Sequence, residues 1–222
     1  MSKPYQIFVG CPFSREVRSV YDHLKREIEA ETPLSIILAD TVGVSSSDYL
    51  LEHITELIRD SAACVFDVTG ANPNVSLEVG IAHTIPVDFI LLLKTRKPRN
   101  SAKRPQERER EVRSIISDLQ GKNRIEYKTY DALKKQLEQR YLNGLPYMKR
   151  WRQFHSQNRA MAPHALRLFA DLRSSGRSTG ARLGAFLDGT GFRVSDVIGA
   201  LTANKLITSR AGRDGGIFYA SK

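Results

Sequence analysis

The chain contains few of the residues that would place it in several large protein classes. Only two cysteines, Cys11 and Cys64, occur among its 222 residues, and both lie in apolar segments rather than at the spacing of metal ligands. A disulfide framework or a zinc knuckle is therefore not expected. Because 41% of the residues are apolar, disordered and collagen-like classes are excluded, and the length suits one large domain or two small ones.

Long hydrophobic runs are also missing. No apolar segment reaches the roughly 18 to 20 residues that cross a bilayer. The polar Met-Ser-Lys-Pro start lacks the apolar core of a signal peptide. We therefore expect a cytoplasmic protein with no membrane partner. His53, His83 and His155 stand apart from one another, and no nucleophile elbow is present, so the sequence predicts neither a metal site nor acyl transfer.

Positive charge is concentrated in the last third of the chain. Residues 141–222 hold 13 basic and 4 acidic residues, a net charge of +9, whereas the first 140 residues hold 21 and 20, a net charge of +1. A local excess of this kind favours contact with a polyanion, because Lys and Arg act on nearby phosphates. A solvated basic face is the alternative.

The first 140 residues alternate between strand and helix patterns. Strands are predicted at 5–10, 34–40, 63–68, 89–94 and 124–127, and helices at 14–30, 48–60, 73–84, 109–120 and 131–141. Strands that are almost wholly apolar, each followed by a helix, indicate a parallel sheet covered on both faces. We therefore predict an α/β fold with a doubly wound five-stranded parallel sheet that binds ligands at the carboxyl ends of its strands.

The pattern changes after residue 141. Residues 142–162 are predicted to be a linker or a docking helix. Three helices at 163–174, 179–187 and 195–205 follow, and then two strands at 207–210 and 217–220 joined by a glycine-rich turn. The predicted organisation is a nucleotide-binding domain at 1–141, a connecting segment at 142–162 and a small C-terminal domain at 163–222.

The C-terminal domain resembles a winged helix-turn-helix domain. The residues that carry the resemblance are Val194, Val197, Ile198, Leu201, Lys205, Leu206, Ile207 and Tyr219. The resemblance implies that the third helix enters the major groove of DNA and that the hairpin meets phosphates. The cations that would serve there are Arg193, Lys205, Arg210 and Arg213. Domains of this type also act as protein-docking and dimerisation modules, so DNA binding is one of two alternatives.

One acidic residue lies on the apolar side of a predicted helix. The helix follows Asp67-Val-Thr69 and begins with Asn72 as N-cap and Pro73 at the first position. Its apolar stripe contains Glu78, whose neighbours on the helix are Asn74, Val75, Ile81 and Ala82. A carboxylate placed there costs several kcal/mol unless it is paired or lines a cavity. Glu78 is therefore a functional candidate, and an ion pair with a neighbouring Arg is the alternative.

These residues resemble a superfamily of nucleotide-cleaving proteins. Asp67-Val-Thr69, Glu78-Val-Gly80-Ile-Ala82 and the first strand with its loop, within residues 5–95, are similar to nucleoside 2-deoxyribosyltransferases, deoxynucleoside-monophosphate N-glycosidases and TIR-like NAD-cleaving domains of bacterial defence proteins. The resemblance implies N-glycosidic cleavage of NAD or a related nucleotide, without a further cofactor, with Glu78 as the catalytic carboxylate. The implied nucleotide-binding residues are Gly10, Cys11, Pro12, Phe13, Asp67, Thr69, Asn72 and Asn74.

One departure from the superfamily bears on the leaving group. Ile54 occupies the position where the deoxyribosyltransferases and monophosphate N-glycosidases carry an Asp that assists the leaving base. A cationic nicotinamide needs no such acid, so this departure favours NAD. The basic, acid-free loop 94–104 after the fourth strand either closes over a pyrophosphate or is a solvated loop.

Two hypotheses follow from these features. In the first, the chain is an enzyme that acts on NAD or a related nucleotide in antiviral defence. In the second, it is a nucleotide-sensing, DNA-binding transcription regulator without turnover. A buried carboxylate favours the enzyme, because a sensor of an anionic ligand gains nothing from it. A homo-oligomer is expected in either case.

Overall fold

The computed structural model describes residues 3–39, 47–95, 124–211 and 217–221. The predicted helix 109–120, most of the basic loop 94–104 and the turn that carries Arg213 lie outside the described residues. The chain divides into two compact units. The first unit contains residues 1–2, 6–25 and 36–142, and the second contains 3–5, 26–35 and 143–222.

The five predicted strands form one parallel sheet, which confirms the predicted α/β class. They are β1 (Lys3–Gly10), β2 (Ser35–Leu38), β3 (Ser61–Asp67), β4 (Asp88–Lys94) and β5 (Arg124–Tyr127), in the order β2-β1-β3-β4-β5. Asp67, the last residue of β3, lies opposite Leu92 of β4. The strand order reverses between β1 and β3, and in sheets of this type ligands bind beside such a reversal, at the carboxyl ends of the strands.

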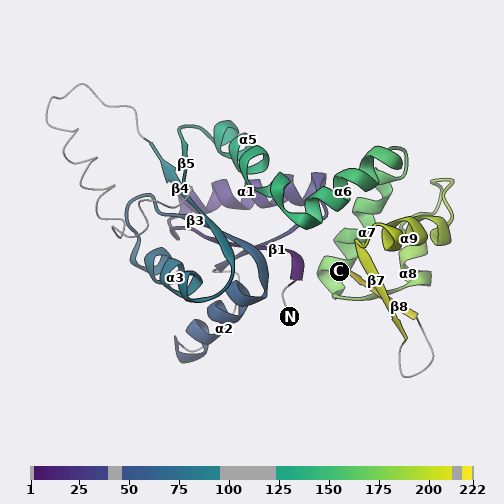
Figure 1. Ribbon diagram of the computed structural model, residues 1–222, viewed down its shortest axis with the longest axis horizontal. Helices are drawn as coiled ribbons and strands as arrows, with labels where there is room; N and C mark the ends of the chain where they lie inside the picture. Colours follow the sequence, from purple (N-terminus) through teal and green to yellow (C-terminus); the bar gives the residue numbers. More distant parts are fainter. Residues whose placement is uncertain (1–2, 40–46, 96–123, 212–216, 222) are drawn as a thin grey trace, which may run out of the picture. The chain divides into compact units, whose positions relative to one another are not determined.

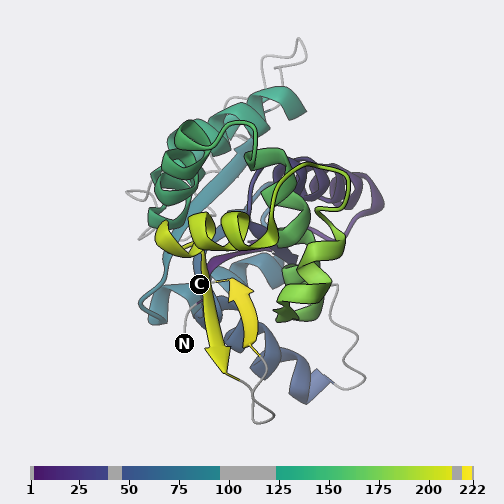
Figure 2. The same cartoon turned by 90° about the vertical axis from the view of Figure 1, so that its right-hand side faces the viewer.

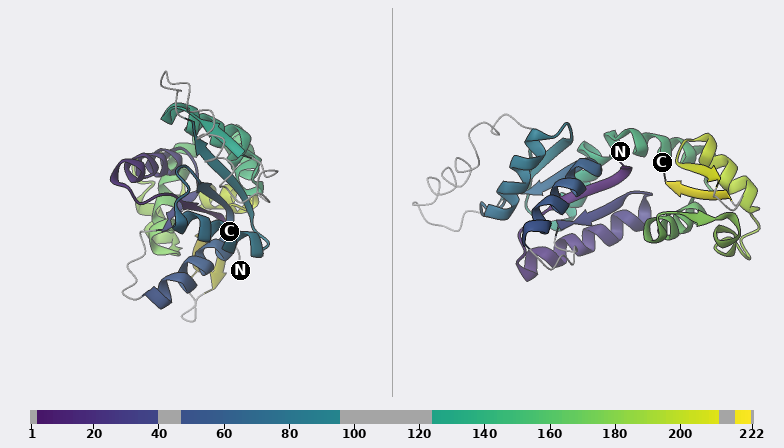
Figure 3. Two further views of the ribbon diagram at one scale, coloured as in Figure 1. Left: turned by 90° about the vertical axis from the view of Figure 1, so that its left-hand side faces the viewer. Right: turned by 90° about the horizontal axis from the view of Figure 1, so that it is seen from below.

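Helices cover both faces of this sheet, as a doubly wound fold requires. In Figure 1, α1 (Arg15–Glu31) and α5 (Tyr130–Arg140) lie above the sheet, and α2 (Ser47–Asp60) and α3 (Pro73–Thr84) lie below it. Figure 3 shows the sheet and its helices from two further sides. On the α2 and α3 face, Phe66 packs between Phe8 and Phe89, with ring centroids 6.0 and 5.9 Å apart. These rings form the apolar floor on which α3 lies.

The second unit consists of helices and a small antiparallel sheet. Its elements are η3 (Leu142–Gly144), α6 (Pro146–Gln157), α7 (Ala162–Ser175), β6 (Ser178–Thr179), α8 (Gly180–Ala185), α9 (Val194–Ala203), β7 (Ile207–Ala211) and β8 (Ile217–Ser221). The strands pair in the order β6-β8-β7, and Figure 2 shows β7 and β8 beside α9. The sequence did not predict β6, because two residues carry no periodicity. The segment left open as a linker or a docking helix folds into η3 and α6.

Aromatic packing and one arginine hold the second unit together. Trp151 of α6 stacks on Phe154 and meets the edge of Phe169 of α7, at centroid distances of 5.3 and 5.9 Å. Arg173 of α7 donates hydrogen bonds to the carbonyl oxygens of Glu29 and Leu34, at 3.0 and 3.1 Å. The last carbonyls of a helix lack intrahelical donors, so Arg173 supplies one to the end of α1.

None of the helices within the described ranges is long and apolar enough to span a lipid bilayer.

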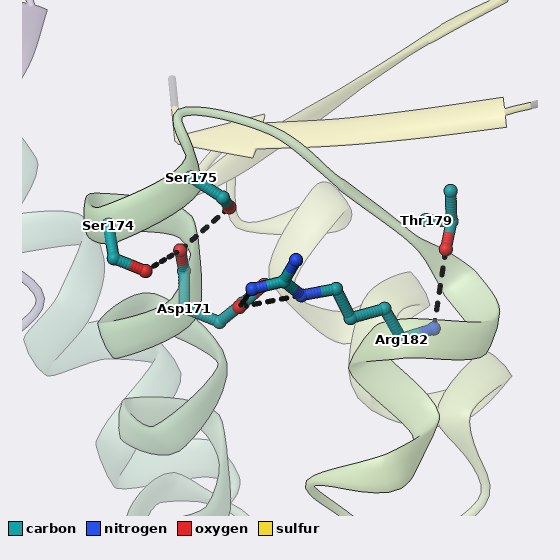
Figure 4. A network of polar contacts seen from close by, with 5 residues as sticks. All are labelled: Asp171, Ser174, Ser175, Thr179 and Arg182. Carbon is teal, nitrogen blue, oxygen red and sulfur yellow. Dashed lines mark hydrogen bonds and ion pairs between the residues drawn. The ribbon is translucent and has the colours of Figure 1, made fainter.

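A buried carboxylate joins α7 to α8 (Figure 4). The Asp171 side chain is only 2% exposed, and its Oδ1 accepts hydrogen bonds from Nε and Nη2 of Arg182 at 2.9 and 2.5 Å. The Asp171 carbonyl oxygen accepts from the hydroxyls of Ser174 and Ser175. Arg182 is itself held by the cap of α8, where Thr179 Oγ1 accepts from its backbone N–H.

Replacing Arg182 with alanine should destabilise the second unit by about 1 to 3 kcal/mol, because it leaves the Asp171 carboxylate buried without its donors. Urea denaturation measures the free energy of unfolding. Arg167→Ala is the matched control, since Arg167 is an exposed α7 residue, and it should change stability by no more than about 0.5 kcal/mol. Equal effects of the two substitutions would contradict the role given to the ion pair.

Candidate functional site

Helix α3 begins where the sequence predicted. Asn72 is the N-cap, and its Oδ1 accepts hydrogen bonds from the backbone N–H groups of Asn74 and Val75 at 3.0 and 3.3 Å. The turn before it places Gly70 at φ +77° and Ala71 at φ +50°. A left-handed alanine costs on the order of 1 kcal/mol, and such conformations cluster at functional sites. The turn thus sets the position from which α3 carries Glu78 over the sheet.

Glu78 is buried, and no described residue supplies a counter-charge to it. It is 3% exposed, and Val75, Val79 and Ala82 of the same helix are buried beside it. Its Oε2 accepts no hydrogen bond from any described residue. Within those residues there is also no cation close enough to affect its ionisation. The ion pair considered as the structural alternative is therefore not formed with any residue in the described ranges.

The carboxylate lies against the backbone of β1 at Gly10. A Cβ atom added to Gly10 would overlap Glu78 Oε2 and would lie 2.7 Å from Cδ1 of Phe66. A side chain at the end of β1 would therefore displace Glu78 or Phe66, and glycine avoids this overlap. The described side chains nearest to Gly10 are Glu78 and Phe66, and its contact with a nucleotide stays a prediction.

Burial has a large effect on the ionisation of Glu78. Desolvation disfavours the charged carboxylate and raises its pKa from 4.5 to about 7. Both protonation states are then populated near neutral pH. A carboxyl group whose pKa is raised by burial at the carboxyl end of a parallel sheet has the properties of a catalytic group.

Asp67 is buried too, but its environment is different. Its Oδ2 accepts hydrogen bonds from the hydroxyls of Tyr21 and Tyr127 at 2.7 and 2.8 Å, and its Oδ1 accepts from the Thr69 N–H at 3.0 Å. Side chains alternate along a strand, so Asp67 faces α1 whereas the preceding Phe66 faces α3. The structure therefore does not bring the two carboxylates of the motif onto one face of the sheet.

The sequence did not identify the two tyrosines. Tyr21 lies on α1 and Tyr127 ends β5, 46 and 60 residues from Asp67. Burial, reinforced by the contact with Asp67, raises the pKa of both phenols well above 10. The only signal in the sequence was Tyr21 within the apolar spacing of its helix. Nothing in that spacing indicates a polar partner.

Of the other residues assigned to the nucleotide, two have structural contacts. Thr69 Oγ1 accepts a hydrogen bond from the Lys94 N–H at 2.8 Å and so joins the ends of β3 and β4. Asn72 Oδ1 is occupied by the helix cap described above. Asn74 is exposed on the first turn of α3, and Pro12 is half-buried after β1. The nucleotide-binding roles of these four residues remain predictions.

Cys11, directly after Gly10, is not poised to be a nucleophile. Burial raises the pKa of its thiol to about 12. Arg18 opposes this shift, whereas the negative charges of Asp67 and Glu78 reinforce it. The thiolate is the reactive form of cysteine, so this side chain stays protonated at neutral pH. Cys11 is therefore a neutral apolar group, close enough to Asp67 and Glu78 for both carboxylates to affect its pKa.

Exposed apolar side chains lie on the segments that leave this edge of the sheet. Phe13 follows β1, Tyr49 lies in the first turn of α2 and Leu77 lies on α3, with exposures of 45%, 68% and 54%. Phe13 was among the residues assigned to the nucleotide.

The cations assigned to DNA do not lie on the body of α9. Arg193 precedes the helix, Lys205 follows it and Arg210 lies on β7; all three are exposed, and Arg213 lies outside the described residues.

The part of the chain that the structure describes holds no group of three or more His, Cys, Asp or Glu side chains arranged to bind a metal ion.

Comparisons with known proteins add no assignment: no protein-family model matches the chain, and a search of curated proteins finds no significant match.

Gly10→Ala should displace Glu78, because the new methyl group competes for the space of Oε2. Overpacking of this kind costs typically 1 to 3 kcal/mol, which urea denaturation would detect. Gly80→Ala on α3 is the matched control, since no other group lies within 4 Å of a Cβ there. It should stabilise the helix by roughly 0.5 to 1 kcal/mol. A Gly10→Ala protein as stable as the parent would contradict the close approach.

Glu78→Gln should change how stability depends on pH. Because the folded-state pKa of Glu78 is raised from 4.5 to about 7, the folded protein binds more protons than the unfolded chain between these values. Its stability contribution therefore falls as the pH rises. The stability of the variant relative to the parent should increase by up to about 3 kcal/mol between pH 5 and pH 8, measured by chemical denaturation. An ion-paired Glu78 predicts the opposite slope.

Proposed function

We propose that the first unit cleaves the N-glycosidic bond of NAD or a related nucleotide, with Glu78 as the catalytic carboxylate. The observation that carries the proposal is the burial of this carboxylate, without a hydrogen-bond donor among the described residues, against Gly10 of β1. It lies beside the reversal of strand order, where ligands of parallel sheets bind. A buried charge without a structural partner is costly, and function is the reason to keep it.

Cleavage of an N-glycosidic bond is assisted by a carboxylate next to the ribose. Departure of the base from C1′ of the ribose creates an oxocarbenium-like cation, which an adjacent carboxylate stabilises or captures. With NAD, the bonding pair leaves with the nicotinamide ring, which becomes neutral. Water then supplies the hydroxyl group at C1′ and releases a proton. No acid is needed for the leaving group, which agrees with Ile54 at the position of the assisting Asp.

The surroundings of Glu78 support a nucleotide more than a sugar alone. Phe13, Tyr49 and Leu77 are exposed on the segments that follow β1, β2 and β3, and apolar side chains suit the flat ring of a base. Asp67 supports the site differently, because its hydrogen bonds to Tyr21 and Tyr127 fix the end of β3 from which α3 departs.

A nucleotide-sensing, DNA-binding regulator is the second candidate. The observation in its favour is the order of elements in the second unit, α7, β6, α8, α9, β7 and β8, with a three-stranded antiparallel sheet. This order is similar to that of a winged helix-turn-helix domain. In that case the first unit binds nucleotide without releasing a base, and a homo-oligomer would match a two-fold DNA site.

The test is to incubate the purified chain with NAD and a panel of nucleotides and to quantify released base by chromatography. Glu78→Gln should lower the rate by about 10² to 10⁴, because it keeps the size of the side chain and removes its charge. Glu52→Gln changes an exposed carboxylate on α2 and should leave the rate unchanged. The value of kcat/KM should rise with pH up to about 7, the pKa of Glu78, and then level off.

Two outcomes would contradict the enzyme. If Glu78→Gln cleaves as fast as the parent, the carboxylate is structural. If no nucleotide releases a base but the chain binds nucleotide and DNA, and each ligand changes the affinity of the other by the same factor, the regulator is the correct function.

A further inference from the structure

Helix α6 has one side committed to the core of the second unit and the other facing outward. Tyr147, Met148, Trp151 and Phe154 are buried. Lys149, Arg152, Gln153 and Ser156 are exposed and fall within a sector of about 100° on the helix. Because the aromatic side is already packed, α6 cannot insert that side into a membrane or offer it to a partner. Only the polar side of α6 is available for contact with another molecule.

The available side carries positive charge and no acid. Between residues 141 and 170 the chain has Lys149, Arg150, Arg152, Arg159 and Arg167 but no Asp or Glu. The contacts of Arg152 and Arg150 are with neutral groups: Arg152 donates to the Asn143 carbonyl oxygen at 2.8 Å, and the Arg150 guanidinium lies 5.4 Å from the centroid of the Tyr147 ring. These contacts orient the cations without neutralising them.

The outward side of α9 has a different composition. Its exposed residues are Ser195, Asp196, Gly199, Thr202 and Ala203, which include one anion and no cation. Arg193 and Lys205 flank the helix, and Asp188 and Asp196 lie close to Arg193 in sequence. In sequence, the segment that contains α6 therefore holds fewer acids than the segment that contains α9.

We propose that the outward side of α6 with Lys149 and Arg152, together with Arg159 in the turn after the helix, contacts the phosphate backbone of a nucleic acid. The composition favours a nucleic acid over an acidic protein. Protein interfaces are built around an apolar centre, and the exposed side of α6 has none, whereas nucleic-acid interfaces are polar and strongly positive. Contacts to phosphate carry no sequence information, so binding through this surface is independent of sequence. The proposal does not depend on the activity of Glu78.

The experiment compares three triple variants of the full chain, each of which removes three positive charges. The first changes Lys149, Arg152 and Arg159 to Gln on and after α6. The second changes Arg193, Lys205 and Arg210 to Gln around α9. The third changes Lys128, Lys135 and Arg140 to Gln in the first unit, where these residues are exposed, and is the charge-matched control. Fluorescence anisotropy with labelled duplex and single-stranded DNA of several sequences gives the affinities at about 50 to 200 mM salt.

The parent should bind DNA with an affinity that falls as salt rises. The α6 variant should bind more weakly to every sequence, and the magnitude of its salt slope should fall by up to about 2.7, since each lost phosphate contact removes about 0.9. The control should change the slope far less. Trp151 is the single tryptophan of the chain and packs in the α6 core, so an unchanged emission spectrum shows that the variant keeps its fold.

Several results would overturn the proposal. The proposal is wrong if the α6 variant binds like the charge-matched control, if the loss of affinity is confined to the α9 variant, or if the parent binds no DNA at micromolar concentration and low salt. Competition by polyglutamate as effective as competition by DNA would also overturn it, because the partner would then be an acidic protein.

Discussion

The hydrogen bonds of the Asp67 carboxylate are the interaction on which the first unit depends most. Asp67 ends β3, and its two oxygens accept from Tyr21 of α1, from Tyr127 of β5 and from the Thr69 N–H. One buried charge thus connects a helix, two strands and the turn that leads to α3. Hydrogen bonds to a charged group are worth more than neutral ones, so these contacts fix the carboxyl edge of the sheet.

Strand alternation separates this structural carboxylate from the one proposed to be catalytic. Phe66 faces α3 and Asp67 faces α1, so the polar contacts of Asp67 lie on the opposite side of β3 from Glu78. The sequence motif suggested that Asp67 and Glu78 act together on a ligand. In the structure the two carboxylates have separate positions. Asp67 fixes the end of β3 through its hydrogen bonds. Helix α3 follows that end and places Glu78 against Gly10, the last residue of β1.

Local signals in the sequence predicted much of the fold and part of the site. Asn72 and Pro73 fixed the start of α3, and helical spacing placed Glu78 among apolar residues, because capping and periodicity are local properties. The partners of Asp67 could not be predicted, since Tyr21 and Tyr127 are brought to it only by the tertiary fold. The same applies to Gly10, whose glycine is explained only by the carboxylate that occupies the space of its missing side chain.

The three buried carboxylates of the described residues, Asp67, Asp171 and Glu78, differ in how the fold satisfies them. Asp67 has three donors, and Asp171 has the guanidinium of Arg182. Each of these two carboxylates links separate elements of the fold through its hydrogen bonds. Glu78 has no donor among the described residues and joins nothing. A glutamine or an apolar residue at this position would avoid the desolvation of a charge. A carboxylate kept there despite this cost is consistent with the catalytic role proposed for Glu78.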